Sequence, residues 1–422
     1  MNIRTVAVEQ INPAPYNPRQ DLKPGDPAYE KLKRSVMEFG YVEPLVWNQR
    51  TGHLVGGHQR FKVLLAQGLQ GVEVSVVDLP LEREKALNIA LNKIQGAWDD
   101  DKLATLLEEL TRLPDFEVSL TGFDLPEISA LFDWQQDLQE DEFDIEAAVA
   151  AIEAPITQPG DCIELGPHRL LCGDSAKASD LQRLLGEARA QLLFTDPPYN
   201  VAYYGGNRPH AEGRPKPSRQ WERIYADNQS QADYETWLAG ILKAVTAFLA
   251  PGAACYIWNG HRQFGPMHQM LTGLGVHVSC VITWAKPNFA IGFGDYNQAT
   301  EFCLYGWKGD GPHRWFGPAN ESTLWEVQRD PTKAYIHPTQ KPLALAQRAL
   351  RNSSLREEVV LDVFLGSGST LIAAESLGRR CYGMELDPRY CDAIVRRYIA
   401  CVGKDKISAE IRTRYCPEVA HG

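Results

Sequence analysis

The 422-residue sequence lacks several features that would place it in a restricted class of proteins. It has no run of about 18 apolar residues, so we expect no transmembrane helix. Its first residues lack the apolar stretch of a secretory signal, and we expect none. None of the nine cysteines forms a Cys-x-x-Cys pair, and their wide spacing favours reduced, mostly buried thiols over disulfides or a metal site. These absences predict a cytoplasmic protein without a membrane partner or a metal.

Basic charge is scarce in the N-terminal part of the chain. The formal net charge is −11, and residues 1–150 contain 14 basic and 26 acidic side chains. The rest of the chain is therefore nearly neutral. This balance argues against a protein that simply coats nucleic acid, although the C-terminal part can still contact phosphates locally. Hydrophobic residues make up 44% of the chain, which is enough apolar material for at least two cores.

Three segments differ in their pattern. Apolar periodicity and short Val-rich runs predict a small α/β domain over residues 1–132. Residues 133–156 are acidic and alanine-rich and predict a solvated linker. From 157 to 410 strands alternate with helices, which predicts an α/β domain whose parallel-rich sheet is covered on both faces. In the first domain, the predicted helices are 29–39, 82–94 and 101–113.

The clearest chemical signal is the turn Asp196-Pro197-Pro198-Tyr199, which follows a buried strand. Functional residues of open α/β sheets lie at the carboxyl ends of strands. Two prolines fix φ and remove two donors, so the turn presents only acceptors, the Asp196 carboxylate and the Pro197 carbonyl. These acceptors suit the exocyclic amino group of a planar base, on which Tyr199 can stack. The alternative is an ordinary proline-rich turn with a capping aspartate.

A second signal is a glycine loop within residues 361–378. Gly366 and Gly368 make a tight loop after a strand, and Ser369 begins a helix. No lysine follows the glycines, and Leu371 stands where a dinucleotide motif has its third glycine, so neither phosphate motif fits. The loop still allows a ligand to approach the backbone at a helix N-terminus. A purely structural glycine turn is the alternative.

Two polar segments accompany the glycine loop. Glu385 lies 23 residues after Asp362, at the end of the next strand, and this spacing suits an acidic residue that binds a ribose diol. Residues 337–342, His-Pro-Thr-Gln-Lys-Pro, place several polar side chains just before a helix. Alone, the second segment is typical of a surface turn with a helix-capping threonine.

Together these segments resemble the motifs of amino-group DNA methyltransferases, which act on adenine N6 or cytosine N4. The Asp-Pro-Pro-Tyr segment precedes the glycine loop, an order that resembles the beta-class permutation of that family. The resemblance covers about residues 157–400. It implies the Rossmann-like sheet of methyltransferases that use S-adenosyl-L-methionine, with permuted motif order.

The resemblance also implies roles for particular residues. The catalytic segment that binds a flipped base would be Asp196, Pro197, Pro198 and Tyr199. The pocket for S-adenosyl-L-methionine would be formed by Asp174, Thr339, Lys341, Asp362, Phe364, Gly366, Gly368, Ser369 and Glu385. The amine lone pair attacks the methyl group directly in this family, so we expect no catalytic cysteine.

Two segments are candidates for contacts with double-stranded DNA. Residues 200–228 are rich in Gly and Pro and carry several basic side chains, which predicts a phosphate clamp beside the catalytic turn. Its predicted DNA-binding residues are Arg208, Arg214, Lys216 and Arg219. A solvated loop without function is the alternative. After a strand at 277–284 we expect a loop-rich region that extends to about residue 336. Within it, residues 286–335 lie where the family keeps its target-recognition segment.

Residues 1–95 resemble the ParB/sulfiredoxin-like fold. The matching segments are Asn17-Pro18-Arg19, Pro44-Leu45-Val46 and Gly56-Gly57-His58-Gln59-Arg60. Glycines before a helix with nearby basic side chains predict a phosphate site, so a bound nucleotide is expected at Gly56, Gly57, His58 and Arg60. The alternative is that His58 and Arg60 are structural residues at a helix start.

We therefore predict an adenine-N6 DNA methyltransferase of the kind found in restriction-modification systems. In this family Asp at the first motif position favours adenine, and Ser favours cytosine. The alternatives are a cytosine-N4 enzyme, an RNA or protein amino-methyltransferase, and a ParB-like DNA-binding regulatory protein whose methylase half is inactive. A homodimer is a further expectation. Because every methyltransferase motif follows residue 160, we also expect a chain that begins near Ala154 to fold and act alone.

Overall fold

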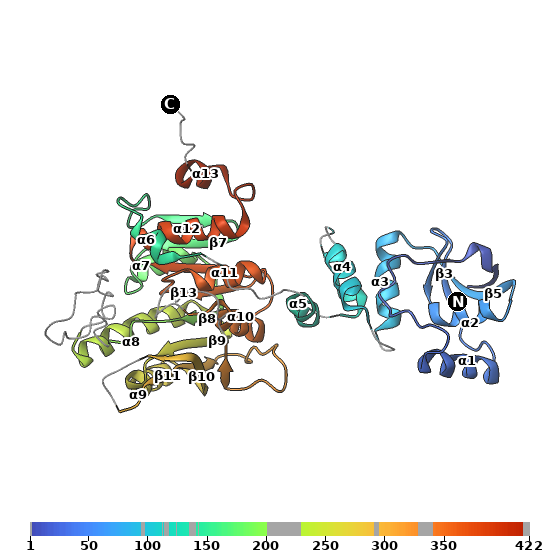
Figure 1. The fold of residues 1–422 in the computed structure, drawn as a ribbon, viewed down its shortest axis with the longest axis horizontal. Coiled ribbons are helices and arrows are strands. Elements are labelled where there is room, and N and C mark those ends of the chain that lie inside the picture. The colour runs from blue at the N-terminus through green and yellow to red at the C-terminus, as the bar shows by residue number, and fades with distance from the viewer. Residues whose placement is uncertain are drawn as a thin grey trace. The chain divides into compact units, whose positions relative to one another are not determined.

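The computed structural model describes residues 2–93, 98–111, 113, 118–123, 125–134, 141, 143–200, 229–290, 295–327 and 341–416. It divides into two compact units, residues 1–135 and 136–422 (Figure 1). Within the described ranges, no helix is both long enough and apolar enough to cross a membrane.

The N-terminal unit contains a mixed sheet of five strands in the order β1-β5-β3-β4-β2. The strands are β1 (Ile3–Ala7), β2 (Asn12–Pro13), β3 (Leu45–Asn48), β4 (His53–Gly56) and β5 (Gly71–Val77). The helices are α1 (Pro27–Phe39), α2 (His58–Ala66), α3 (Leu81–Asn92), α4 (Asp100–Thr111) and α5 (Leu125–Trp134), with short 3-10 helices η1 (Val8–Gln10) and η2 (Val118–Thr121). The predicted helices 29–39, 82–94 and 101–113 correspond to α1, α3 and α4. Each predicted start and end lies within two residues of the observed one.

A buried carboxylate joins α3 to the hairpin of β3 and β4. Glu84 is fully buried, and four side chains bond to its two oxygens. Its partners are Tyr16, Asn48, Thr51 and His53. Burial by itself raises the pKa of Glu84, but these hydrogen bonds outweigh burial and hold the pKa below its usual value. The network therefore stabilises an ionised carboxylate inside the unit.

The C-terminal unit is built on a sheet of nine strands in the order β12-β10-β11-β9-β8-β13-β14-β7-β6. The strands are β6 (Cys162–Leu165), β7 (His168–Cys172), β8 (Ala190–Thr195), β9 (Leu249–Asn259), β10 (Val276–Ala290), β11 (Gln298–Lys308), β12 (Leu324–Glu326), β13 (Val359–Asp362) and β14 (Arg380–Glu385). The helices are α6 (Ile145–Ala150), α7 (Ala178–Leu185), α8 (Gln231–Ala247), α9 (Phe264–Gly273), α10 (Leu343–Ser353), α11 (Ser369–Ser376), α12 (Pro388–Val402) and α13 (Ala409–Tyr415), with the 3-10 helix η3 (His261–Gln263). Five central strands, β9, β8, β13, β14 and β7, run parallel, which confirms the predicted α/β class.

Helices cover both faces of this sheet (Figure 1). Side chains of β8 alternate between two cores: Leu192 and Phe194 lie in the core with α10, α11 and α12, and Leu193 lies in the core with α7, α8 and α9. Strands that are buried on both faces read as continuous apolar runs, and this is why the sequence revealed them.

The strand order of the sheet has a switch point between β8 and β13. Along the chain β8 is followed by β9 on one side of this point, and β13 is followed by β14 on the other side. These strands pair in parallel, with Leu193 opposite Leu361, so their carboxyl ends lie at the same edge. The Thr195 hydroxyl donates to Asp362 Oδ1 at 2.9 Å and joins the two strand ends. Ligands of open α/β sheets bind outside the carboxyl ends of strands at such a switch point.

The structure corrects the prediction of a solvated linker over residues 133–156. Residues 145–150 form α6. Asp144 is the N-cap of this helix, and its carboxylate accepts from the Ala147 amide at 2.9 Å. Ile145 and Ile152 are buried against Ala393 of α12. The apolar side chains lie on one helical face, and the acidic composition concealed this pattern.

The structure also corrects the loop-rich interpretation of residues 286–335. β11 lies between β9 and β10 in the sheet, and β12 pairs with β10. Cys303 and Leu304 of β11 are buried in the two cores. Much of the predicted target-recognition segment is thus a structural part of the sheet.

Two glycines of this unit should respond oppositely to alanine. A Cβ at Gly306 in β11 would lie 2.1 Å from the backbone oxygen of His277, so Gly306→Ala should destabilise the protein by about 1–3 kcal/mol. A Cβ at Gly240 in α8 would meet nothing within 4 Å, so Gly240→Ala should stabilise it by about 0.5–1 kcal/mol. Thermal unfolding of both variants against the parent protein measures the two signs. Shifts of the same sign would contradict this account.

Candidate active site

The turn of Asp196 to Tyr199 follows β8 and is held from two sides. The hydroxyl of Tyr234 in α8, which is buried, donates to the Pro198 carbonyl at 2.6 Å. Gln263 Nε2 donates to the Tyr199 carbonyl at 3.2 Å. Together with the two prolines, these bonds fix the turn before any ligand binds.

An amide clasp follows the turn. The side chain of Asn200 accepts from the Gln229 amide at 2.8 Å and donates to the Gln229 carbonyl at 3.1 Å. Asn200 itself has a φ of +55°, which asparagine tolerates better than most residues. These two hydrogen bonds connect Asn200 with Gln229, the residues that flank positions 201–228.

Asp196 belongs to a cluster of charged side chains. The Tyr199 hydroxyl donates to Asp196 Oδ1 at 2.7 Å, and Lys341 Nζ donates to Oδ2. Lys341 Nζ also lies 3.2 Å from Glu301 Oε2, and Glu301 Oε1 pairs with Lys286. The Lys341 side chain is only 9% exposed, whereas that of Asp196 is 31% exposed. Two carboxylates thus face two ammonium groups, and their charges balance.

Burial and these neighbours set the pKa values of the cluster. Burial raises the pKa of Asp196; the Lys341 charge opposes this effect, and Glu301 adds to it. Burial also acts to raise the pKa of Glu301, but the charges of Lys341 and Lys286 hold it below its usual value. Burial acts to lower the pKa of Lys341, yet Asp196 and Glu301 raise it above its usual value. Lys341 therefore carries its charge despite its burial.

Aromatic rings surround the Lys341 ammonium. Its Nζ lies 5.1 Å from the centroid of the Trp258 ring and 5.5 Å from that of Tyr199. Such cation–π contacts stabilise a cation that has lost much of its water. The Tyr199 side chain also packs over Gly260, where a Cβ would lie 3.4 Å away. The cluster thus combines a flat aromatic surface with fixed acceptors.

The glycine loop between β13 and α11 has a backbone that favours glycine. Gly366 and Gly368 have φ values of +54° and +82°. A Cβ at Gly366 would meet only the Phe364 oxygen, at 3.8 Å, so open space lies on that side of the loop. The Gly366 amide donates to Glu385 Oε2 at 2.9 Å and ties the loop to the end of β14.

Three backbone amides bond to the Glu385 carboxylate. The amides of Leu386 and Asp387 donate to its Oε1 at 2.8 and 2.9 Å, and that of Gly366 donates to Oε2. Burial raises the pKa of Glu385 to about 7, although these backbone bonds oppose it. A carboxylate has about four acceptor positions, so Oε2 can still accept from a ligand's hydroxyl group.

Asp362 supports the loop from inside the protein. It is buried; its Oδ1 accepts from Thr195 at 2.9 Å and from the Phe364 amide at 3.1 Å, and its Oδ2 accepts from Thr370 at 2.6 Å. Burial raises the pKa of Asp362 to about 6, although these hydrogen bonds oppose it. The side chain therefore joins β8, the loop and α11.

Other predicted cofactor residues lie along the same edge. Asp174 follows β7, which pairs with β14, and its Oδ1 accepts from the Ala176 amide at 3.0 Å. Ser369 begins α11, and its hydroxyl donates to the Lys341 carbonyl at 3.3 Å. The Lys341 ammonium itself lies at the Asp196 turn, and only its backbone reaches the glycine loop.

Five predicted residues lie outside the described residues, and their roles stay predictions. They are Thr339, Arg208, Arg214, Lys216 and Arg219.

The predicted phosphate site of the N-terminal unit lies at the start of α2. Gly57 has a φ of +89°, and a Cβ there would lie 2.5 Å from Leu45, so packing requires this glycine. Arg60 pairs with the Glu43 carboxylate. Burial lowers the pKa of His58 to about 4. A bound nucleotide stays a prediction here.

Sequence reasoning missed Glu301 and Lys286. Glu301 lies on β11, and Lys286 lies on the neighbouring β10, two residues beyond Trp284, the register partner of Glu301. The available signal was a carboxylate at the start of the apolar run Phe302 to Trp307, inside a segment that we interpreted as loop.

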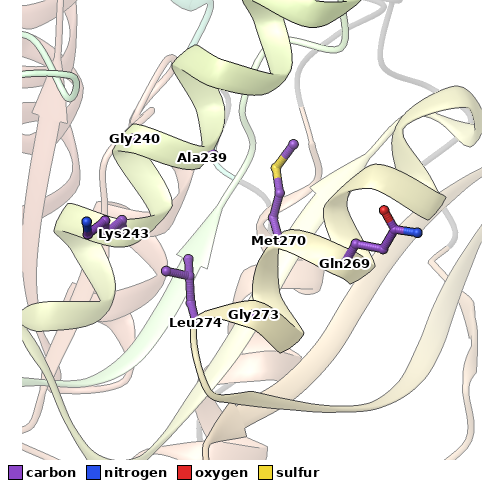
Figure 2. Close-up of a pocket in the computed structure, with 7 residues that line it drawn as sticks. All are labelled: Ala239, Gly240, Lys243, Gln269, Met270, Gly273 and Leu274. Carbon is purple, nitrogen blue, oxygen red and sulfur yellow. The ribbon is translucent and has the colours of Figure 1, made fainter.

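A pocket between α8 and α9 lies apart from these groups (Figure 2). It is lined by Ala239, Gly240, Lys243, Gln269, Met270, Gly273 and Leu274. None of these is a predicted site residue, and Lys243 is the only charged group among them.

Models of known families match three parts of the chain. The model described as DNA methylase matches residues 190–396, which include the Asp196 turn, Glu301, Lys341 and the glycine loop. This part of the chain belongs to the DNA methylase family. The model of the ParB N-terminal domain matches residues 1–93, and that of the ParB-methyltransferase HTH domain matches residues 101–159. The enzyme is thus a DNA methyltransferase of the N6/N4 type with ParB-related domains.

Type II methyltransferases align with about half of this chain. The type II methyltransferase M2.MboI of Moraxella bovis is 24% identical over 238 residues, which cover 52% of this chain and 85% of that protein. M2.DpnII of Streptococcus pneumoniae is 24% identical over 230 residues, which cover 50% of this chain and 84% of that protein.

Solved structures of DNA methyltransferases align over a similar fraction of the chain. The M1.HpyAVI–SAM complex is 23% identical and covers 54% of this chain and 98% of its own, with a TM-score of 0.39. The cytosine-N4-specific PvuII DNA methyltransferase is 17% identical and covers 58% of this chain and 90% of its own, with a TM-score of 0.43.

Proposed function

We propose that the enzyme transfers a methyl group from S-adenosyl-L-methionine to the N6 amino group of an adenine flipped out of double-stranded DNA. The proposal rests on the meeting of two sites at one sheet edge. The acceptor turn at Asp196 and the glycine loop at Gly366 follow neighbouring parallel strands, and the bond between Thr195 and Asp362 joins them. A base in the first site lies beside a ligand in the second.

Asp196 and Pro197 orient the target amine. The amine has two N–H groups, and the turn offers two fixed acceptors, the carboxylate and the Pro197 carbonyl. Accepting both N–H bonds draws the nitrogen lone pair out of conjugation with the ring. The lone pair then acts as the nucleophile toward the methyl group.

Lys341 and Glu301 keep Asp196 in the state that this role needs. A carboxylate oxygen accepts more than one hydrogen bond, so the amine can bind Asp196 while Lys341 and Tyr199 stay close. Glu301 holds the Lys341 ammonium from the other side. The nitrogen releases one proton after methyl transfer, and Asp196, whose pKa burial raises, is the acceptor for it.

The residues at the second site fit S-adenosyl-L-methionine. Bound there, this cofactor supplies an electrophilic methyl group. Glu385 would accept from the ribose hydroxyls, and the glycine loop would lie along the ligand on its open side at Gly366. Asp174 follows β7 at the same edge of the sheet and would face the adenine end.

Two further segments support DNA as the substrate. Residues 101–159 match an HTH domain of ParB-type methyltransferases. The basic residues Arg208, Arg214, Lys216 and Arg219 lie in the segment next to the turn. Cations that contact phosphates bind any sequence, so the choice of site requires base contacts from other residues.

The choice of adenine over cytosine rests on the residue that opens the motif. Asp occupies this position, and in the family Asp favours adenine while Ser favours cytosine. The acceptors themselves fit both amines, because each amine offers two N–H groups.

Analysis of the methylated base tests the proposal. The purified protein is incubated with unmethylated DNA and S-adenosyl-L-methionine that carries a labelled methyl group, and the DNA is digested to nucleosides for mass spectrometry. We expect label in N6-methyl-2′-deoxyadenosine. Label in N4-methyl-2′-deoxycytidine would keep the mechanism and replace the base. Cofactor binding without any labelled nucleoside would favour the inactive, DNA-binding alternative.

Asp196→Ala and Glu385→Ala should separate chemistry from cofactor binding. A charged hydrogen bond contributes about 1.5–3 kcal/mol, so Asp196→Ala should lower the rate of transfer at least about tenfold while cofactor affinity changes only a few fold. Glu385→Ala should weaken cofactor binding at least about tenfold, and activity should partly return at saturating cofactor. Calorimetry gives the affinities, and the exposed Glu187→Ala serves as control. Loss of cofactor affinity in folded Asp196→Ala would contradict its role.

Lys341→Gln and Glu301→Gln should shift the pH dependence in opposite directions. Transfer requires ionised Asp196, so the rate falls as the pH drops through its pKa. Lys341 lowers the pKa of Asp196, so Lys341→Gln should move the acidic limb to higher pH. Glu301 raises this pKa, so Glu301→Gln should move the limb to lower pH. Single-turnover rates at saturating cofactor and DNA, measured over a range of pH, give the shift of the acidic limb for each variant. If both variants shift the limb in the same direction, the proposed role of the cluster is wrong.

A further inference from the structure

The segment that precedes the methyltransferase sheet is anchored along α12. Asp392 of α12 accepts from the amides of Ile156 and Thr157 at 2.6 and 2.9 Å. Tyr390 donates to Glu146 at 3.0 Å. Earlier in the segment, the carboxylate of Asp141 pairs with an arginine of α12. The segment over residues 141–157 is therefore a packed part of the C-terminal unit.

Asp141 forms a two-point ion pair with Arg397. Arg397 Nε lies 2.6 Å from Oδ2 of Asp141, and Arg397 Nη2 lies 2.8 Å from Oδ1. The Arg397 side chain is 0% exposed, and that of Asp141 is 24% exposed. Two parallel N–H···O bonds fix the plane of the guanidinium as well as its position.

The same guanidinium reaches the glycine loop. Arg397 Nη1 donates to the Ser367 carbonyl at 2.8 Å and lies 3.4 Å from the Ser369 hydroxyl. Ile394, one helical turn earlier, lies under Gly368, where a Cβ would come within 3.1 Å of it. Ile394 and Arg397 lie on one face of α12, and this face therefore packs against the glycine loop and supports it.

We propose that Asp141 is a positioning residue of the cofactor site: it orients Arg397, and Arg397 in turn holds the loop through the Ser367 carbonyl. The inference rests on the proposed function, because it takes the loop's ligand to be S-adenosyl-L-methionine. Without Asp141, the buried guanidinium loses its counter-charge and has to draw in water or turn toward solvent. Either movement removes the support of Ser367 and loosens the loop.

This role revises the expected boundary of the catalytic part. A chain that begins near Ala154 lacks Asp141 and α6, so it lacks the partner of Arg397. Asp141 also lies within the range that matches the ParB-methyltransferase HTH domain. The final part of that matched range thus contributes to the cofactor site, although every methyltransferase motif lies beyond it.

Full-length variants at residue 141 test the inference by calorimetric titration with S-adenosyl-L-methionine. Asp141→Asn and Asp141→Ala should weaken binding about tenfold or more, which is the effect of losing a charged hydrogen-bonded pair. They should raise the Michaelis constant for the cofactor with little change in the turnover number at saturation. Asp141→Glu, which keeps the carboxylate, should restore much of the affinity. Hydrogen exchange of the amides of residues 366–370 should be faster in Asp141→Asn without any ligand.

Tyr390→Phe is the matched control, because it removes a hydrogen bond of the same segment that does not reach the loop. It should leave cofactor affinity within about twofold of the parent, even if thermal stability falls as much as in Asp141→Asn. Unchanged affinity and unchanged loop exchange in folded Asp141→Asn would overturn the inference. Failure of the parent protein to bind the cofactor would instead overturn the proposed function.

Discussion

Charge compensation is the constraint on which the active site depends. The proposed role of Asp196 requires the ionised form, yet its burial favours the neutral form. Lys341 supplies the opposing charge, and the two carboxylates, Asp196 and Glu301, together raise its pKa above the usual value in spite of its burial. Glu301 in turn relies on Lys286. Four side chains from separate parts of the chain therefore have to meet before the turn has its chemistry.

Asp362 has an equally central place on the cofactor side. One carboxylate binds the end of β8, the start of the glycine loop and the first turn of α11. The relative position of the Asp196 turn and the glycine loop is thus set by hydrogen bonds at the sheet edge. Support from α12 reaches the same loop from the opposite side, through Ile394 and Arg397. The glycine loop is therefore supported by the sheet edge and by α12, and its own Leu365 is buried in the core.

The sequence predicted the central strands and the two halves of the site because both depend on local patterns. Buried parallel strands are continuous apolar runs, and strand ends carry their functional residues directly after them. The same reasoning missed β11, since its polar and exposed start at Gln298 conceals the buried Cys303 and Leu304. It also missed Glu301 and Lys286 of the charged cluster, and the partner of Arg397, because these pairs join residues that lie far apart in the chain. Such pairs depend on three-dimensional contact, and spacing along one sequence does not reveal them.

The pairing of β8 with β13 has a consequence for the order in which the protein acquires its structure. Thr195 and Asp362 lie 167 positions apart in the chain, yet they are in direct contact. Contacts between distant residues form slowly, because a long loop has to close first. During synthesis, domains tend to fold from the N-terminus, so the ParB-related unit can be complete while β8 still lacks its neighbour. The newly made chain therefore gains its N-terminal domains before it has any centre capable of methyl transfer.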